Sequence, residues 1–208
     1  MSFFENTRRP TGLGGRAMVA MMNVGHRALA DWGLQFLKVP SDAAVLDCGC
    51  GGGANIKRLL AQCPRGSVAG VDYAAVSVEK SQAVNRGAIE AGRCRVLRAS
   101  VAALPFEDAQ FDLVTAFETV YFWPGLQPCF DEVYRVLKPG GTFFICNESG
   151  GDNAKDDKWT ERIDGMTIYT DVQLRAALEQ CGFSDIRMHK SPRGWLCASA
   201  RKTGGMQA

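Results

Sequence analysis

The sequence has little net charge, few histidines and no cysteine spacing of the metal-binding kind. Its 208 residues contain 24 Lys and Arg against 22 Asp and Glu, a net charge of +2. Nucleic-acid-binding chains usually carry a larger, clustered basic excess, so we expect no nucleic-acid partner. The eight cysteines form no Cys-x-x-Cys pair, and His26 and His189 are isolated. We therefore expect reduced, packed cysteines and no metal.

Long apolar runs are missing too. No run is long enough for a membrane span, and the first ten residues lack the apolar core of a signal peptide. The composition, 46% hydrophobic and 22% charged, is that of an ordinary globular domain. We therefore expect a soluble cytoplasmic protein without a membrane span.

Short β-rich runs alternate with helical patterns from residue 43 onward, which is typical of α/β units around a mostly parallel sheet. The pattern predicts strands at 44–48, 67–71, 94–98, 111–117 and 142–146. It predicts helices at 55–62, 75–91, 130–137 and 171–181, the last capped by Thr170 or Asp171, and a polar loop at 147–158. Lys138-Pro139-Gly140-Gly141 should end the third of these helices. Residues 183–189 and 195–200 predict a terminal antiparallel hairpin.

The segment before the first strand has a different pattern. Residues 16–38 are helix-like, with Gly25 and Gly33 interrupting a methionine-rich apolar face, and two short helices fit best. They either pack on the sheet edge or form a lid over a binding crevice, since methionine adapts to irregular ligands. The predicted domains are a helical cap at 1–40, a binding domain at 41–202 and a flexible tail at 203–208.

The clearest local signal is the glycine-rich turn after the first strand, Val45-Leu46-Asp47-Cys48-Gly49-Cys50-Gly51-Gly52-Gly53. Glycines there allow a tight turn and close backbone approach to a ligand, and the following helix offers free N–H groups. Asp72 ends the second strand, where a carboxylate can accept hydrogen bonds from ribose hydroxyls. Both features suit any adenosine cofactor, NAD included.

Asp47 distinguishes between the cofactors. A carboxylate two residues before the first glycine would repel a dinucleotide pyrophosphate. It would attract S-adenosylmethionine, whose sulfonium and α-amino groups are cationic. The sequence therefore favours S-adenosylmethionine over NAD.

With these motifs in place, the chain resembles class I S-adenosylmethionine-dependent methyltransferases, in the subgroup of ubiquinone/menaquinone-type and other small-molecule enzymes. The resemblance covers about residues 43–200 and also includes Val71-Asp72-Tyr73, Leu104-Pro105-Phe106 and Leu137-Lys138-Pro139-Gly140-Gly141. It implies an α/β, Rossmann-like open sheet of seven strands in the order 3-2-1-4-5-7-6, with helices on both faces. S-adenosylhomocysteine would be the product left by the cofactor.

The resemblance also implies roles for individual residues. Gly49, Cys50 and Gly51 would line the cofactor, with Asp47 facing its methionine portion. Asp72 would bind the ribose and Tyr73 would pack on the adenine. Ser100 and Val101 stand where relatives usually place an aspartate against the adenine amino group, and the Phe117 carbonyl would meet the cofactor amino group.

The methyl acceptor should lie beside the loop after the fourth strand, Glu118-Thr119-Val120-Tyr121-Phe122-Trp123-Pro124. Its aromatic residues suit a small apolar or aromatic acceptor. Methyl transfer is an in-line displacement that depends mainly on positioning, so a general base is needed only for some acceptors. Glu118, Tyr121 and His26 are the catalytic candidates, each also open to a purely structural interpretation, and Glu148 with Asn147 is a weaker pair.

Other functions stay open at this point. An NAD-linked oxidoreductase would use the same glycine turn, but no Tyr-x-x-x-Lys pair accompanies it and Asp47 is unexplained. A non-catalytic domain could keep the cofactor pocket. A nucleic-acid or protein methylase is disfavoured, because Glu118-Thr119-Val120-Tyr121 stands where many amino-group nucleic-acid methylases carry their Pro-Pro signature.

Overall fold

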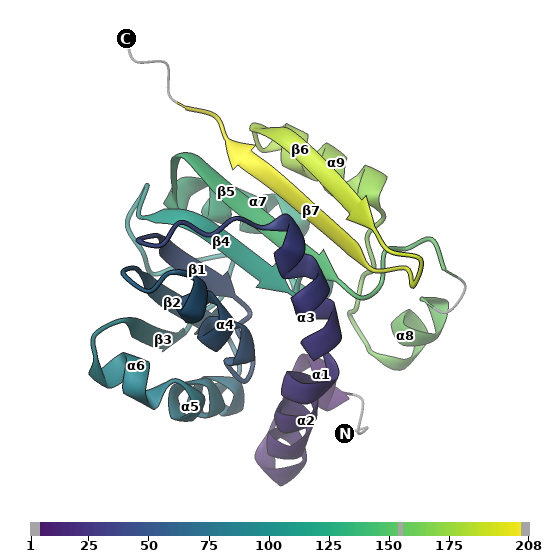
Figure 1. Ribbon diagram of the computed structural model, residues 1–208. Coiled ribbons are helices and arrows are strands. Elements are labelled where there is room, and N and C mark those ends of the chain that lie inside the picture. The colour runs from purple at the N-terminus through teal and green to yellow at the C-terminus, as the bar shows by residue number, and fades with distance from the viewer. Residues whose placement is uncertain (1–4, 154–155, 205–208) are drawn as a thin grey trace.

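The computed structural model describes residues 5–153 and 156–204. Within them, seven strands form one sheet in the order β3-β2-β1-β4-β5-β7-β6 (Figure 1). The strands are β1 (Ala44–Cys48), β2 (Ser67–Asp72), β3 (Cys94–Arg98), β4 (Phe111–Phe117), β5 (Leu137–Asn147), β6 (Phe183–Lys190) and β7 (Leu196–Lys202). Strands β1 to β5 are parallel, and β7 runs antiparallel to both β5 and β6. The predicted strand order and terminal hairpin are confirmed.

Helices cover both faces of the sheet, as predicted. They are α1 (Glu5–Arg8), α2 (Gly12–Gly25), α3 (Arg27–Gly33), α4 (Ala54–Gln62), α5 (Ala75–Val84), α6 (Arg86–Glu90), α7 (Leu126–Val136), α8 (Asp157–Arg162) and α9 (Asp171–Gln180), with 3-10 turns at Leu34–Phe36 and Val120–Phe122. One apolar core packs α7 and α9 on the sheet, and the other packs α3, α4 and α5 on its opposite face. Parallel strands buried on both faces need such near-continuous apolar runs. No helix in the described ranges is long and apolar enough to cross a membrane.

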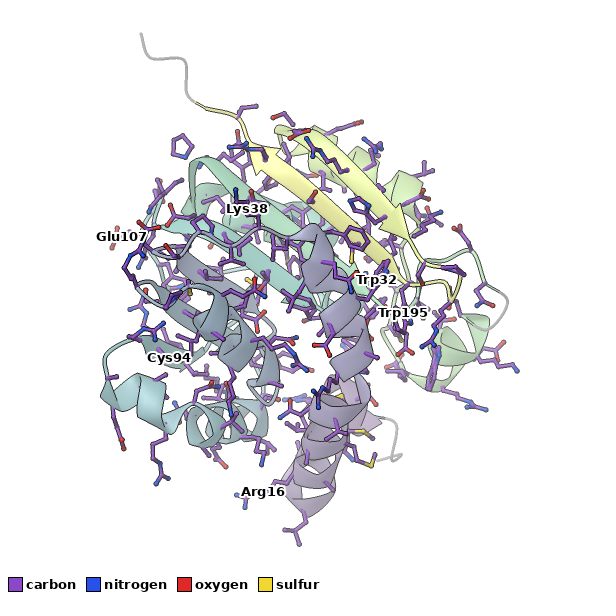
Figure 2. The ribbon with its side chains drawn as sticks, viewed as in Figure 1. Arg16, Trp32, Lys38, Cys94, Glu107 and Trp195 are labelled. Atoms are coloured by element: carbon purple, nitrogen blue, oxygen red, sulfur yellow. The ribbon has the colours of Figure 1, made fainter. Side chains whose placement is uncertain are left out.

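The N-terminal segment forms two successive helices, as the glycines predicted, with the break at His26. Helix α3 packs on the sheet through Leu29 and Ala30. The ring centroid of Trp32 lies 5.7 Å from that of Trp195, beside the hairpin (Figure 2). Gly33 is required there, because a Cβ would lie 2.6 Å from the Cys146 sulfur. Helix α3 thus packs on the sheet, whereas residues of α2 line the pocket described below. The division into a cap, a binding domain and a tail stays a prediction, and residues 205–208 of the tail lie outside the described residues.

Several predicted element bounds were wrong. The single helix over 75–91 is divided at Asn85, whose side-chain amide donates to the carbonyls of Gly53 and Ser81. Helix α7 begins at Leu126 instead of residue 130.

Strand β5 already begins at Leu137, because Leu137 pairs with Phe111 before the register shifts at the Lys138–Gly141 bulge. The 147–158 segment, predicted as a loop, contains the start of α8. Of the two predicted caps of α9, Thr170 is the one observed: its side chain accepts from the Gln173 backbone amide, and the Gln173 side chain accepts from the Thr170 backbone amide, a capping box that was not predicted.

Candidate cofactor and acceptor site

The glycine turn between β1 and α4 is held in left-handed backbone conformations. Gly49, Gly51 and Gly53 have φ values of 73°, 50° and 79°, a region that other residues adopt at a cost. The neighbours of these glycines differ. A Cβ on Gly49 would lie 2.0 Å from the Thr119 hydroxyl, whereas a Cβ on Gly51 would meet nothing within 4 Å. Gly49 thus permits close packing inside the protein, and Gly51 leaves bare backbone facing open space.

Asp72 anchors this turn from the end of β2. One carboxylate oxygen accepts a hydrogen bond from the Gly51 amide at 3.0 Å, and the other accepts from the Ala74 amide at 2.9 Å. Burial raises the pKa of Asp72, while these bonds oppose the rise. Asp72 lines the pocket, and each carboxylate oxygen can accept a second hydrogen bond. It can therefore hold the turn and accept ribose hydroxyls at once.

Asp47 lies beneath the turn. It is 2% exposed, does not line the pocket, and accepts a 2.7 Å hydrogen bond from the Thr115 hydroxyl. Burial raises its pKa to about 7, and nearby Asp72 raises it further against the Thr115 bond. The pKa of both carboxylates at this turn is raised, so a cation bound above them would stabilise the ionised form of each.

The other residues predicted to bind the cofactor also line the pocket. They are Cys50, Tyr73, Ser100, Val101 and Phe117. The Cys50 thiol is buried, which raises its pKa well above the usual range and argues against reactivity. The Ser100 hydroxyl accepts a hydrogen bond from the Ala102 amide at 3.2 Å, so its oxygen is partly engaged within its own loop.

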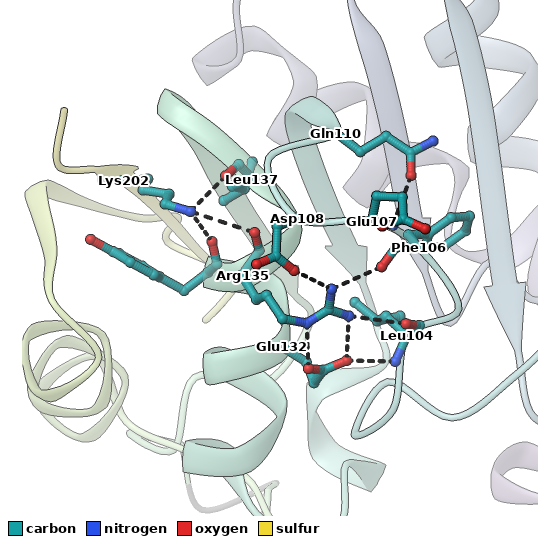
Figure 3. A network of polar contacts seen from close by, with 10 residues as sticks. Leu104, Phe106, Glu107, Asp108, Gln110, Glu132, Arg135, Leu137 and Lys202 are labelled. Atoms are coloured by element: carbon teal, nitrogen blue, oxygen red, sulfur yellow. Dashed lines mark hydrogen bonds and ion pairs between the residues drawn. The ribbon is translucent and has the colours of Figure 1, made fainter. Parts of the chain in front are cut away.

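An arginine fixes the loop that follows Ser100 and Val101 (Figure 3). Arg135 of α7 donates to the carbonyls of Leu104 and Phe106 at 3.0 and 2.8 Å, and it pairs with Glu132 and Asp108, each at 2.8 Å. Glu132 in turn accepts from the Leu104 amide at 2.7 Å, and its contacts with Arg135 lower its pKa. The network ties the loop to α7 from outside the pocket.

The three catalytic candidates, far apart in the sequence, meet at the other end of the pocket. Glu118 follows β4 with a φ of 58°, unusual for a residue with a side chain. One of its carboxylate oxygens accepts from the Tyr121 hydroxyl at 3.2 Å and from the Glu148 amide. The other lies 3.8 Å from His26 Nε2. The backbone conformation thus aims the carboxylate at the junction of α2 and α3.

Burial controls the protonation of this group. It raises the pKa of Glu118 to about 8, with a smaller contribution from the Glu148 carboxylate. Burial also lowers the pKa of His26 against the opposing effect of Glu148, and raises that of Tyr121 well above its usual range. Tyr121 is therefore a neutral hydroxyl, and it accepts from the Ser149 amide at 2.8 Å.

Glu148 belongs with these candidates, whereas its neighbour Asn147 does not. Donor atoms of His26, Glu118 and Glu148 all lie within 4.8 Å of one another, a carboxylate–imidazole set chemically able to hold a divalent cation. Asn147 is fully buried outside the pocket lining, and no described residue hydrogen-bonds to its side chain. The absence of a metal stays a prediction from the sequence.

One cavity of about 800 Å³ joins the glycine turn to this acidic group. Sequence reasoning missed part of its wall. Asn23 of α2 donates to the Gly52 carbonyl at 3.1 Å, and no sequence motif reveals it. Thr119 belongs to the predicted acceptor loop, but its packing against Gly49 was not predicted. The apolar part of the remaining wall comes from α2, the loop after β4 and the α8 region, with Met18, Met21, Met22, Phe122, Trp123, Trp159, Ile163 and Met166. Polar and charged side chains line the pocket as well: Thr7, Arg8, Arg9, Asn55, Arg58 and Asp164.

Comparison with known proteins agrees with this arrangement. Residues 46–145 match the family described as "Methyltransferase domain". Cycloartenol-C-24-methyltransferase 1 of Oryza sativa subsp. japonica is 35% identical over 109 residues, which cover 52% of this chain and 31% of the relative. The chain thus spans about a third of that relative's length.

Two solved structures share the fold. A chain from the complex between the Haloferax volcanii Trm112 methyltransferase activator and a methyltransferase has a TM-score of 0.83 at 20% identity, covering 97% of this chain and 98% of its own. The SAM-dependent methyltransferase of Aquifex aeolicus has a TM-score of 0.75 at 16% identity, covering 90% and 98%. The two structures show that the chain shares the fold of these methyltransferases, and the family match covers the part of the chain from β1 to β5 that includes Asp47, Asp72 and Glu118.

The residues at the glycine turn fit S-adenosylmethionine. Gly51 presents open backbone, Asp72 keeps acceptor capacity, and the buried Asp47 and Asp72 carboxylates favour a cation over them. A dinucleotide pyrophosphate would instead bring negative charge to the same two carboxylates.

Proposed function

We propose that this protein transfers the methyl group of S-adenosylmethionine to a small, largely apolar acceptor. One observation carries the proposal: a single cavity connects the glycine turn and Asp72 with an apolar compartment that encloses Glu118. Cofactor and acceptor would therefore share one space, as an in-line displacement requires.

When bound, S-adenosylmethionine supplies a methyl group already activated by its sulfonium. The protein has to orient the acceptor and exclude water. Methionine side chains of α2 form one wall of the compartment, and Trp159, Ile163 and Met166 form another. These side chains suit an acceptor that is recognised by shape and apolar contact more than by charge.

Glu118 is the residue that we propose to accept a proton from the acceptor, with Tyr121 and His26 as positioning residues. Tyr121 donates to the carboxylate, and His26 faces its other oxygen. At a pKa of about 8 the empty-pocket carboxyl is mostly protonated at neutral pH. A cationic ligand in the same cavity favours the ionised form and so prepares Glu118 as a base.

The relative from Oryza is named for methylation at C-24 of cycloartenol, an apolar isoprenoid. This supports an apolar acceptor, with carbon as the proposed methylated atom. Methylation of an alkene carbon ends with proton loss, a role that fits Glu118. The quinone-methyltransferase subgroup suggested by the sequence stays a prediction.

The test is formation of S-adenosylhomocysteine from S-adenosylmethionine with a sterol, a linear isoprenoid and a quinol offered separately. We expect turnover with one or more of these acceptors, and at least tenfold lower kcat with little change in cofactor affinity in Glu118→Gln. Thermal unfolding with S-adenosylhomocysteine and with NAD runs in parallel. Stabilisation by NAD alone would overturn the proposal, and cofactor binding without turnover on any acceptor would favour a binding domain.

A further inference from the structure

The outward face of α2 is apolar. Leu13 and Val24 are 85% and 74% exposed, and the exposed Ala17 and Ala20 lie between them in sequence. Met21, 54% exposed, stands at the edge of this face and also lines the pocket. Scattered exposed apolar residues are normal on protein surfaces, whereas a continuous strip along one helix is not.

Helical geometry shows that these five residues do form a strip. At about 100° of rotation per residue, they fall within an arc of roughly 100°. The side of α2 that packs against the domain carries Gly15, Met18 and Val19 and lies nearly opposite. A surface helix normally carries polar residues at that position, so α2 has two apolar faces and only one of them is covered by the described residues.

The segment around the strip is basic. Arg16 and Arg27 border the strip and residues 6–30 contain no acidic residue, whereas Arg8 and Arg9 line the pocket. Arg16 extends from α2 into solvent (Figure 2) and pairs with Glu79, and Arg27 pairs with Asp31, all with exposed side chains. Exposed ion pairs of this kind contribute little to folding stability. The arginines can therefore exchange these partners for anionic groups outside the protein.

We propose that the outward face of α2 docks on the surface of an anionic lipid bilayer. An apolar strip bordered by arginines is the pattern of helices that lie in a membrane interface. A second copy of the chain fits less well, because a two-fold contact through this strip would bring the Arg16 side chains of both copies together. Docking itself does not depend on the proposed methyl transfer. If that function holds, docking also places the pocket beneath α2 next to the phase that dissolves an apolar acceptor.

The experiment is co-sedimentation of the full chain with vesicles of phosphatidylcholine, alone or with one quarter phosphatidylglycerol. We expect binding to the anionic vesicles, weaker binding to the neutral ones, and loss of binding as salt rises. Leu13→Ser/Val24→Ser should weaken binding at least tenfold. Arg16→Gln/Arg27→Gln should reduce binding to anionic vesicles only.

Val172→Ser is the matched control. Val172 is 71% exposed on α9, as open as Val24 but outside the strip, so this variant should bind like the unmodified protein. Circular dichroism and thermal unfolding check that each variant is folded. Absence of binding to anionic vesicles, or equal loss in Val172→Ser, overturns the proposal. A dimer that Leu13→Ser/Val24→Ser dissolves, without vesicle binding, would assign the strip to self-association. Vesicle binding is measured without cofactor or acceptor, so failure of the proposed catalysis would leave it unchanged.

Discussion

Two alanine substitutions in the glycine turn separate its structural role from its ligand-binding role. Gly49→Ala and Gly51→Ala add the same methyl group to residues with φ of 73° and 50°. The left-handed conformation costs each variant about 1–2 kcal/mol of folding free energy. For Gly51→Ala that is the whole cost, since its Cβ meets nothing within 4 Å. For a chain of this size it lowers Tm by roughly 2–8 °C.

Gly49→Ala should lose more stability. Its Cβ would lie 2.0 Å from the Thr119 hydroxyl and 2.6 Å from the Thr119 Cβ, so the loop after β4 must shift. Overpacking adds about 1–3 kcal/mol to the conformational cost. Shortening Thr119 should relieve this overpacking. Gly49→Ala should therefore cost less folding free energy in a Thr119→Gly background than in the unmodified protein.

Binding should rank the two variants in a different way. The methyl of Gly51→Ala enters the open space where the cofactor is proposed to lie, so its affinity for S-adenosylhomocysteine should fall at least tenfold despite the small stability loss. Isothermal titration calorimetry measures the affinity and urea unfolding the stability. A Gly51→Ala variant with unchanged affinity would refute the assignment of this turn to the cofactor.

Three further predictions follow from the buried groups. Asp72→Asn keeps the acceptor oxygen but loses the charge, and should weaken S-adenosylhomocysteine binding at least tenfold in the same calorimetric assay; an unchanged affinity would contradict the ribose assignment. Glu118 has a folded pKa of about 8, above its usual 4.5, so the ligand-free protein should lose stability as pH rises from 4.5 to 8, by at most about 1.4 kcal/mol per pH unit from this group. Urea unfolding across this range should show a flatter profile in Glu118→Gln, and an identical profile would refute the raised pKa. Arg135→Ala removes donors to two loop carbonyls and both carboxylate pairs, and should cost about 2–4 kcal/mol in unfolding assays with a smaller effect on cofactor affinity; a loss below 0.5 kcal/mol would show that the loop holds without it.

That the glycine turn and Asp72 would lie together at one end of the pocket could be predicted from the sequence because the determinants of this arrangement are local. The turn after β1 and Asp72 after β2 are each encoded in a few consecutive residues, and parallel strands bring their carboxyl ends to one edge of the sheet. Strand order followed from the same family pattern. The predicted bounds of helices and strands were wrong where pairing with a distant segment extended an element. Strand β5, for example, begins at Leu137 because Leu137 pairs with Phe111 ahead of the bulge.

The acceptor end could be predicted only as a set of candidates. Nothing local in the sequence shows that His26 would approach Glu118 from 92 positions away, or that Glu118 would take a left-handed conformation. These contacts depend on where α2 ends and how α3 docks, through the close approach of Gly33 to Cys146. The contacts of Asn23 with Gly52 and of Thr119 with Gly49 likewise depend on packing and have no local sequence signal.

The division of the pocket wall along the chain has an evolutionary consequence. The family match covers residues 46–145, which hold the glycines of the turn, Asp72 and the loop after β4, whereas the methionines of α2 and the side chains around α8 lie outside it. A change of acceptor can therefore draw on the two flanking segments together with the loop after β4, while the glycine turn and Asp72 stay unchanged. Exchanging residues before 46, residues 118–124 and residues after 145 between homologues is accordingly the way to test whether these segments set substrate preference.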